Sequence, residues 1–206
     1  MSNQSTTQSN AGGAPARYSS PTPPRAPANA ASAPVRNAAG QQTPDSKEEH
    51  RRSEQPRYKV FGVKAGAVFE LDTLTSSLAT VAIEMATCVN PRQYDWANKI
   101  TFQLTRKELP QFVGMLAGAA KPNTKLEFKG HGDEHDKNLR ITQQGGNLLL
   151  TIGQKQALLS VQIGIPDTFH LIALCMRALA KNDPHLDSQT ILELCKSVCR
   201  AVPAQT

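Results

Sequence analysis

The chain alternates between apolar and polar residues in eight short stretches, the first of which begins at Tyr58. A period of two is typical of strands that bury one face. The dipeptide Gly145-Gly146 separates the sixth stretch from the seventh, which predicts a tight hairpin. The eight predicted strands lie within residues 58–66, 67–74, 78–89, 99–104, 121–132, 138–144, 147–154 and 157–165.

The fourth of these strands, which follows a loop predicted at residues 90–98, changes into a helix. Its alternating pattern is followed by apolar residues spaced i, i+3, i+4 and i+7, as on one face of a helix. Thr105 and Glu108 fit the capping box T-x-x-E, so the helix is predicted to begin there without a loop. The apolar positions of the strand and then of the helix are Ile100, Phe102, Leu104, Leu109, Phe112, Val113 and Leu116.

Two further helices are predicted near the C-terminus. Pro166 and Asp167 open the first of them, because proline suits the first helical turn. Its predicted buried stripe is Phe169, Ile172, Ala173, Met176 and Leu179, and Leu171, Leu174 and Cys175 extend the apolar surface nearly all round. The last helix, about 187–200, carries Ile191, Leu194, Cys195 and Val198, and either caps the domain or pairs with a second subunit.

The predicted elements occur twice in the same order. Residues 58–118 and 124–181 both consist of four strands and a helix, and each helix has an early phenylalanine, Phe112 or Phe169. A repeated order of this kind indicates an α+β fold of two β-β-β-β-α units with antiparallel sheets. The predicted domain spans 58–181, followed by a C-terminal helix and tail at 182–206.

The first 57 residues differ in composition from the rest. They hold eight of the fourteen prolines amid Ser, Thr, Gln, Asn, Gly and Ala, with Tyr18 as the only aromatic residue. Such a segment buries too little apolar surface to offset its ordering entropy, so residues 1–57 are predicted to be a disordered tail. No acidic residue precedes Asp45, which leaves an organellar transit peptide as the alternative.

The net charge and the cysteines indicate the compartment in which the protein is expected. The tail has seven basic and four acidic residues, so it carries half of the formal net charge of +6 and the predicted domain is mildly basic. Cys88, Cys175, Cys195 and Cys199 stand among apolar residues without a C-x-x-C pair, which indicates buried thiols in a reducing compartment. No apolar run has the length of a membrane span, and a cytoplasmic, nucleoid-associated location is expected.

Two β-β-β-β-α units, each with a strand that runs directly into a helix, resemble the Whirly fold, in the superfamily of the transcriptional coactivator positive cofactor four. The resemblance rests on KITFQLTRKELPQFVGMLAG (99–118) and SVQIGIPDTFHLIALCMRALA (160–180) and covers residues 58–181. It implies binding of single-stranded nucleic acid without strong sequence preference. It also implies a homo-oligomer, and the Whirly proteins, which form tetramers, suggest that number of subunits.

The strand residues permit this chemistry, because single-strand binders need cations for phosphates and flat rings for bases. Tyr94 and Trp96 are candidates for a stacking platform, although Trp96 could equally be a plug over the sheet edge. Considered singly, each cation could belong to an ordinary solvated sheet face. Glu70, Glu84 and Glu127 are also expected at outward strand positions, so no face is purely basic. The candidate nucleic-acid-binding residues are Lys59, Lys64, Tyr94, Trp96, Lys99, Lys125, Lys129, Arg140 and Lys155.

Other chemistry is less well supported. The stretch HGDEHD, with His131, Asp133, Glu134, His135 and Asp136, contains metal-ligand residue types, but its spacing and glycines indicate a connection between strands. No nucleophile elbow, P-loop or G-x-G-x-x-G occurs, so neither an enzyme nor a cofactor is expected. The expected partner is single-stranded DNA. The alternatives are an RNA-binding protein of the same fold and a protein-interaction module.

Overall fold

The computed structural model describes residues 56–203. The predicted disordered tail therefore lies outside the described residues, except for Pro56 and Arg57, and Arg57 already belongs to the first strand. Within this part of the chain, no helix combines the length and apolar character needed to cross a membrane.

The first sheet is antiparallel and centres on one long strand, β3, which pairs with three others. Along β3, β5 pairs with the middle and the short β4 with the C-terminal end. The predicted loop 90–98 thus contains β4 and a 3-10 helix, η1 (Trp96–Asn98), so the prediction was wrong there. The strands are β1 (Arg57–Phe61), β2 (Ala65–Thr73), β3 (Ala79–Asn90), β4 (Gln93–Tyr94) and β5 (Ile100–Gln103).

The second sheet contains four antiparallel strands in sequential order. The predicted hairpin at Gly145-Gly146 is confirmed, because Gln144 pairs with Asn147 across the turn. Gly145 has φ +59°, a conformation that glycine adopts without strain. The strands are β6 (Lys125–His131), β7 (Lys137–Gln144), β8 (Asn147–Gln154) and β9 (Ala157–Ile163).

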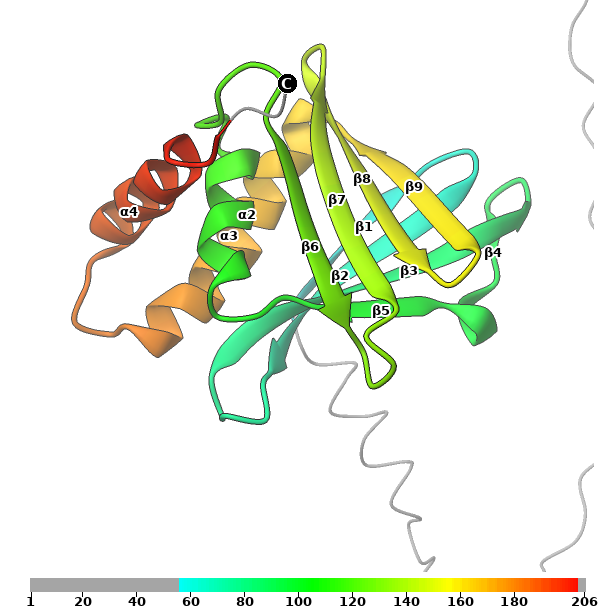
Figure 1. Cartoon of the computed structure of the whole chain (residues 1–206), viewed down its shortest axis with the longest axis horizontal. Coiled ribbons are helices and arrows are strands. Elements are labelled where there is room, and N and C mark those ends of the chain that lie inside the picture. The colour runs from blue at the N-terminus through cyan, green and yellow to red at the C-terminus, as the bar shows by residue number, and fades with distance from the viewer. Residues whose placement is uncertain (1–55, 204–206) are drawn as a thin grey trace, which may run out of the picture. The chain divides into compact units, whose positions relative to one another are not determined.

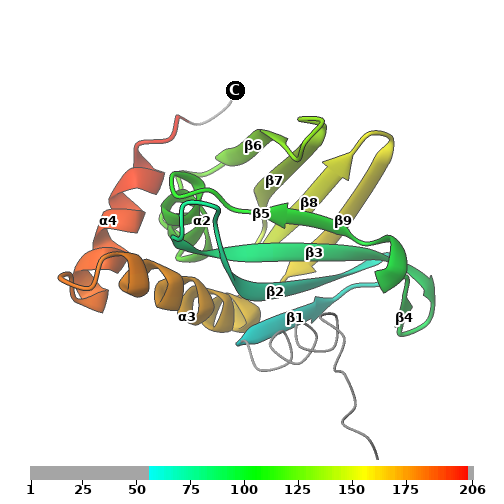
Figure 2. The ribbon, with the colours of Figure 1, turned by 90° about the horizontal axis from the view of Figure 1, so that it is seen from below.

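The two sheets pack against each other and their strands cross, with the helices grouped at one end (Figures 1 and 2). Each sheet turns one apolar face inward, as the alternating pattern predicts. Phe69, Ile83 and Phe102 from the first sheet are fully buried, as are Ile141 and Ile152 from the second. The predicted α+β architecture of two antiparallel sheets with helices is therefore confirmed, with β4 as an addition to the first unit.

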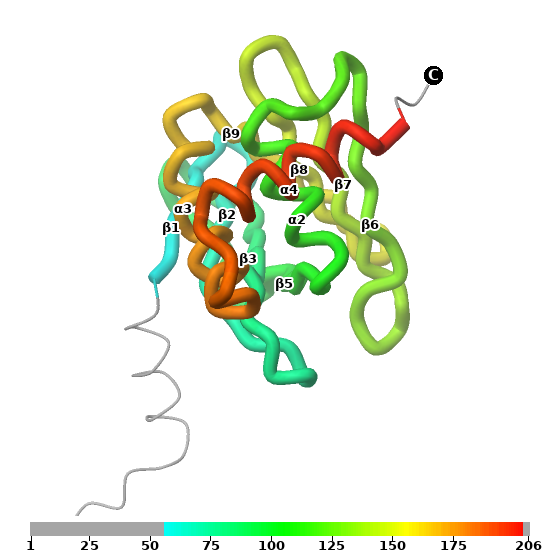
Figure 3. The backbone as a smooth tube through the Cα atoms, turned by 90° about the vertical axis from the view of Figure 1, so that its left-hand side faces the viewer, coloured from blue at the N-terminus to red at the C-terminus, as the bar shows by residue number. Residues whose placement is uncertain are grey.

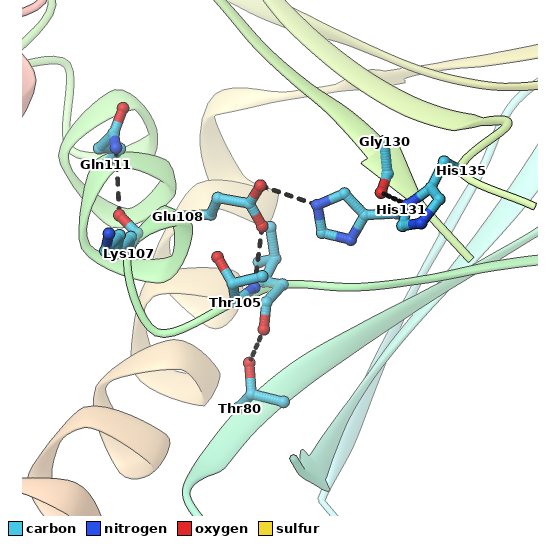
Figure 4. Close-up of polar contacts among 9 residues, drawn as sticks. Thr80, Thr105, Lys107, Glu108, Gln111, Gly130, His131 and His135 are labelled. Carbon is cyan, nitrogen blue, oxygen red and sulfur yellow. Dashed lines mark hydrogen bonds and ion pairs between the residues drawn. The ribbon is translucent and has the colours of Figure 1, made fainter. Parts of the chain in front are cut away.

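Helix α2 (Glu108–Leu116) follows β5 after a link of four residues, 104–107. The predicted capping box forms in part, since Glu108 Oε2 accepts a hydrogen bond from the Thr105 backbone N–H at 2.9 Å (Figure 4). The Thr105 carbonyl also accepts from the backbone N–H groups of Glu108 and Leu109. The strand-to-helix junction is thus short and hydrogen-bonded, but not free of a connection. All four predicted apolar positions of α2 are buried.

Helix α3 (Ile165–Asn182) lies along β1, β2 and β3 of the first sheet. Near its start, Asp167 accepts a hydrogen bond from the Tyr58 hydroxyl at 2.8 Å. At its end, the side chain of Asn182 makes two hydrogen bonds to the backbone of Ala79, each 2.7 Å long. These contacts fix both ends of the helix on the sheet.

The stripe predicted for α3 is right for Leu179, which is buried, but wrong for Phe169 and Ala173, which are exposed. Leu171, Leu174 and Cys175 face the core together with Ala178 and Leu179, whereas Phe169 is 70% exposed. The helix is apolar on two adjacent faces, so its periodicity does not show which of them is buried. The hydrogen bonds at Asp167 and Asn182 orient the helix so that one of these faces packs on the sheet. Phe112 and Phe169 occupy similar places in the two units, yet Phe112 is completely buried.

Helix α4 (Ser188–Arg200) packs beside α2 (Figure 3). Its buried residues are Ile191, Cys195 and Cys199, whereas Leu194 and Val198 of the predicted stripe are exposed. The alternative that the stripe pairs with a second subunit stays a prediction. Gly114 of α2 allows the close approach, because a Cβ there would lie 2.4 Å from both the Cys195 carbonyl oxygen and the Cys199 Cβ.

Replacing Gly114 with alanine is expected to push α4 away from α2. Overpacking of this kind typically costs about 1–3 kcal/mol in the free energy of unfolding. Urea unfolding of Gly114→Ala measures this loss. In the control Gly146→Ala, the nearest atom to the added Cβ is 3.6 Å away, so its stability should stay within about 0.5 kcal/mol of wild type. Equal stability of the two variants would contradict the close helix contact.

Candidate nucleic-acid interface

The strand register defines the outer face of the first sheet, which points away from the second sheet. One row across this face runs from Lys59 through Val68 and Glu84 to Thr101. Lys99, just before β5, forms an ion pair with Glu84, with 2.6 Å between Nζ and Oε1. The predicted cations Lys59 and Lys99 therefore lie on the same face, and Lys99 is partly neutralised by a carboxylate.

Three aromatic side chains form a row at the end of this face, here called the aromatic row: Phe61, Tyr94 and Trp96. The ring centroids of Phe61 and Tyr94 are 5.1 Å apart and stacked, and those of Tyr94 and Trp96 are 6.1 Å apart. The Tyr94 hydroxyl donates a hydrogen bond to the Gly62 carbonyl at 2.9 Å. Phe61 is 55% exposed, whereas Tyr94 and Trp96 are half-buried. The row thus combines an anchored centre with an accessible end.

Gly66 provides the seat for two of these rings. It pairs with Phe61 in the ladder between β1 and β2. A Cβ at this position would stand 3.0 Å from Cδ1 of both Phe61 and Tyr94. The absence of a side chain on Gly66 therefore lets both rings lie close to the sheet.

A groove of about 1000 Å³ begins at the aromatic row. It is formed by the β1–β2 turn, the β3–β4 turn and the outer side of strands β8 and β9. A second hollow holds Trp96 and shares Phe61 and Tyr94 with the groove. The side chains that line the groove include Phe61, Val63, Lys64, Val89, Arg92, Leu149, Ser160 and Gln162.

The groove leads onto the outer face of the second sheet. Gln162 and Leu149, which line it, continue a row through Thr142 to Lys125. Ser160 begins the neighbouring row, which runs through Thr151 and Arg140 to Glu127. The predicted cations Lys125 and Arg140 therefore lie on rows that start in the groove.

Glu127 gathers three of the predicted cations around one carboxylate, and these four residues are called the Glu127 cluster. Its oxygens lie 2.9 Å from Arg140 Nη2, 3.3 Å from Lys129 Nζ and 3.4 Å from Lys125 Nζ. The pKa of Glu127 is lowered from 4.5 to about 2, mainly because Arg140 donates a hydrogen bond to the charged carboxylate. The cluster is a fixed set of charges with a net charge of +2.

The remaining predicted cations lie elsewhere. Lys64 lines the groove, and within the described residues neither Lys64 nor Lys59 forms an ion pair. Lys155 is in the β8–β9 turn and pairs with Glu134 at 2.7 Å, which raises the pKa of Lys155. Lys155 is therefore separate from both the aromatic row and the Glu127 cluster.

The sequence did not reveal several residues of the groove. The alternation within residues 58–66 centres on Phe61 and Val63, which predicts that they share one strand face. Instead Val60 is the buried neighbour, and Val63 is 92% exposed. The alternation within residues 78–89 predicts Val89 on the same side as Val81, Ile83 and Met85, yet Val89 is 58% exposed near the β3–β4 turn. The signal that could have revealed Phe61 is its position next to Val60, because adjacent strand residues face opposite ways.

The histidine-rich stretch between β6 and β7 does not converge on one point. His131 Nε2 lies 2.8 Å from Glu108 Oε1 (Figure 4), and its ring packs on Phe102 with centroids 4.0 Å apart. His135 Nδ1 instead contacts the Gly130 carbonyl. Among residues 56–203, no group of three or more potential ligands is arranged to hold a metal ion.

Comparison with known proteins gives a family for part of the chain. Residues 72–162, from the end of β2 to β9, match the model of the family described as Whirly transcription factor. No curated protein matches the chain. The match includes Tyr94, Trp96 and Glu127, but it begins after Phe61.

Solved plant structures are also similar. The crystal structures of WHY1 and WHY3 from Arabidopsis thaliana have 19% and 21% sequence identity to this chain, with TM-scores of 0.47 and 0.45. Each match covers 62% of this chain, and 85% and 88% of WHY1 and WHY3 respectively. The plant transcriptional regulator PBF-2 has 18% identity and a TM-score of 0.49, over 64% of this chain and 84% of its own.

The fold and the partial family match agree with each other. The aromatic row and the cations on the outer sheet faces are the two kinds of group that single-strand binders use, flat rings and positive charges. The predicted resemblance is confirmed to this extent: residues 72–162 match the Whirly family model.

The low pKa of Glu127 predicts a specific acid dependence. A carboxyl whose pKa is about 2 in the folded state and about 4.5 in the unfolded state stabilises the fold above pH 4.5. That contribution is lost as the pH falls toward 2. Wild type should therefore lose more stability between pH 5 and pH 2 than Glu127→Gln, by on the order of 1 kcal/mol because partly exposed ion pairs are screened.

Urea unfolding at several pH values measures this difference. Arg140→Gln keeps the carboxyl but removes the main donor, so its acid dependence should fall between those of wild type and Glu127→Gln. Parallel curves for all three proteins would show that the Glu127 cluster does not form in solution.

Proposed function

We propose that this protein binds single-stranded DNA with little sequence preference through the aromatic row and the adjoining groove. The observation that carries the proposal is the position of Phe61, Tyr94 and Trp96 beside a groove that contains Lys64 and Arg92. Rings for bases and cations for phosphates are the two requirements of sequence-tolerant single-strand binding.

The aromatic row supplies the base contacts. Phe61 exposes more than half of its surface, and the hydrogen bond from the Tyr94 hydroxyl to the Gly62 carbonyl fixes the Tyr94 ring. A base stacked on such a ring contributes about 1–3 kcal/mol, whatever its identity. In a duplex the base faces are already stacked on each other, so this arrangement favours single strands.

Cations on both sheets supply the phosphate contacts. Lys64 and Arg92 line the groove beside the aromatic row. Lys59 and Lys99 lie on the outer face of the same sheet. Lys125, Lys129 and Arg140 extend the positive surface across the second sheet. Lys155, at the far hairpin, contributes only long-range attraction.

The wider role follows from this chemistry. A single-strand binder of this kind acts in replication, recombination, repair or transfer of mobile DNA, where strands are exposed. A homo-oligomer is part of the proposal, because Leu194 and Val198, one turn apart on α4, are exposed apolar residues. The proposed location is the cytoplasm at the nucleoid, or an organelle if the N-terminal segment is a targeting signal.

Titration with an oligo-dT strand tests the proposal, and the single tryptophan, Trp96, reports binding by its fluorescence. We expect micromolar or tighter binding at low salt, a marked change in Trp96 emission and a steep loss of affinity with salt. Phe61→Leu should weaken binding by about fivefold or more, because one stacking surface is lost.

Phe169→Leu is the matched control, since Phe169 is also exposed but lies on α3, and its oligomeric state is checked by size-exclusion chromatography. Its affinity should equal that of wild type. An RNA strand and a duplex of the same sequence form the other arms of the titration. Absence of oligo-dT binding by the folded protein at low salt would refute the proposal and favour a protein-interaction module.

A further inference from the structure

The Glu127 carboxylate lies below the cations that surround it. Its side chain is 14% exposed, compared with 71% for Lys129 and 45% for Arg140. It belongs to β6, an edge strand of the second sheet, and Lys125 and Lys129 flank it two residues away on the same face. The carboxylate is therefore a permanent part of the surface that these cations form.

This carboxylate occupies donors that a phosphate would also use. Each of the three cations directs one contact to Glu127, so an incoming phosphodiester must share or replace those contacts. The lowered pKa means that Glu127 stays charged throughout the physiological pH range. Like charges repel, so the carboxylate opposes the phosphate that its neighbours attract.

We propose that Glu127 competes with the phosphodiester backbone for Lys125, Lys129 and Arg140, and thereby limits the affinity of the second sheet for single-stranded DNA. This inference rests on the proposed function, because it assumes that the strand crosses the rows leading from the groove to β6. Ser160, Thr151 and Arg140 form one such row, with Glu127 at its end.

The competition has a measurable signature in salt dependence. Binding releases roughly one counterion per phosphate that a cation neutralises, with a slope of about 0.7 per phosphate for single strands. A cation already paired with a carboxylate contributes less to this release. Removing the charge of Glu127 raises the net charge of the cluster from +2 to +3, so the slope should steepen by about 0.7.

Glu127→Gln is the direct test, because the amide preserves the shape of the side chain and its hydrogen bond with Arg140. We expect oligo-dT binding about three- to tenfold tighter than wild type at low salt, with the steeper salt slope. Thermal melting and circular dichroism establish that the variant is folded.

Glu193→Gln is the matched control for net charge. It also raises the formal charge of the chain by one, but Glu193 pairs with Lys196 on α4, at 2.7 Å. Its affinity should stay within about twofold of wild type, because the change lies on a helix away from the cluster. A general effect of net charge would instead tighten both variants equally, which would overturn the inference.

A second variant, Arg140→Gln, tests the competition itself. In wild type, this change should weaken binding by only about twofold, because Arg140 is already occupied by Glu127. In the Glu127→Gln background, the same change should weaken binding by about fivefold or more. Equal effects in both backgrounds would contradict competition for the arginine.

The remaining outcomes separate this inference from the proposed function. Weaker binding by folded Glu127→Gln would mean that the carboxylate organises the cations for phosphate, which would overturn the inference. Unchanged affinity and slope would also overturn the inference, because the strand would then not contact the Glu127 cluster, but they would leave binding by the aromatic row intact. Absence of wild-type binding would refute the proposed function, and the inference with it.

Discussion

The burial of one face of each sheet against the other is the constraint on which the rest of this structure depends. Residues such as Phe69, Phe102, Ile141 and Ile152 are removed completely from solvent by this packing. Because side chains alternate along a strand, burying one face fixes which residues point outward. The cations, the partly buried acids and the aromatic row owe their positions to this alternation.

Turns at one end of the sheets then create the proposed binding surface. Strand β1 ends at Phe61, and β4 places Tyr94 beside it. Gly66 leaves room for both rings. Between the β1–β2 and β3–β4 turns, the groove reaches the outer side of β9. The binding proposed for this surface depends on stacking and charge attraction.

The sequence pattern predicted the architecture well where burial is regular. The eight strands, the Gly145-Gly146 hairpin and the apolar face of α2 follow directly from periodicity and turn chemistry. Predictions failed where either of two apolar positions, or either of two apolar helix faces, could be the buried one. Val60 and Phe61 are adjacent, and only tertiary packing decides which faces inward. On α3, the anchors at Asp167 and Asn182 select the buried face, and periodicity cannot show them.

The candidate site was predictable in its residue types but not in its grouping. Tyr94 and Trp96 were recognisable from the sequence. Phe61, the third residue of the aromatic row, comes from a strand more than 30 positions earlier. The convergence of three cations on Glu127 depends on the register between β6 and β7, which pairs Glu127 with Arg140. Register is a long-range property, so the charge balance of the outer faces emerges only in the folded chain.

Photo-cross-linking tests the central claim most directly, namely that the aromatic row binds the bases of a single strand. An oligo-dT strand containing photoreactive thymine analogues is bound to the full chain, irradiated, and the cross-linked residues are identified by mass spectrometry. The account predicts cross-links at Phe61, Tyr94 or Trp96, since these rings stack on bases. Cross-links confined to α3 and α4, or to residues outside 56–203, would contradict it.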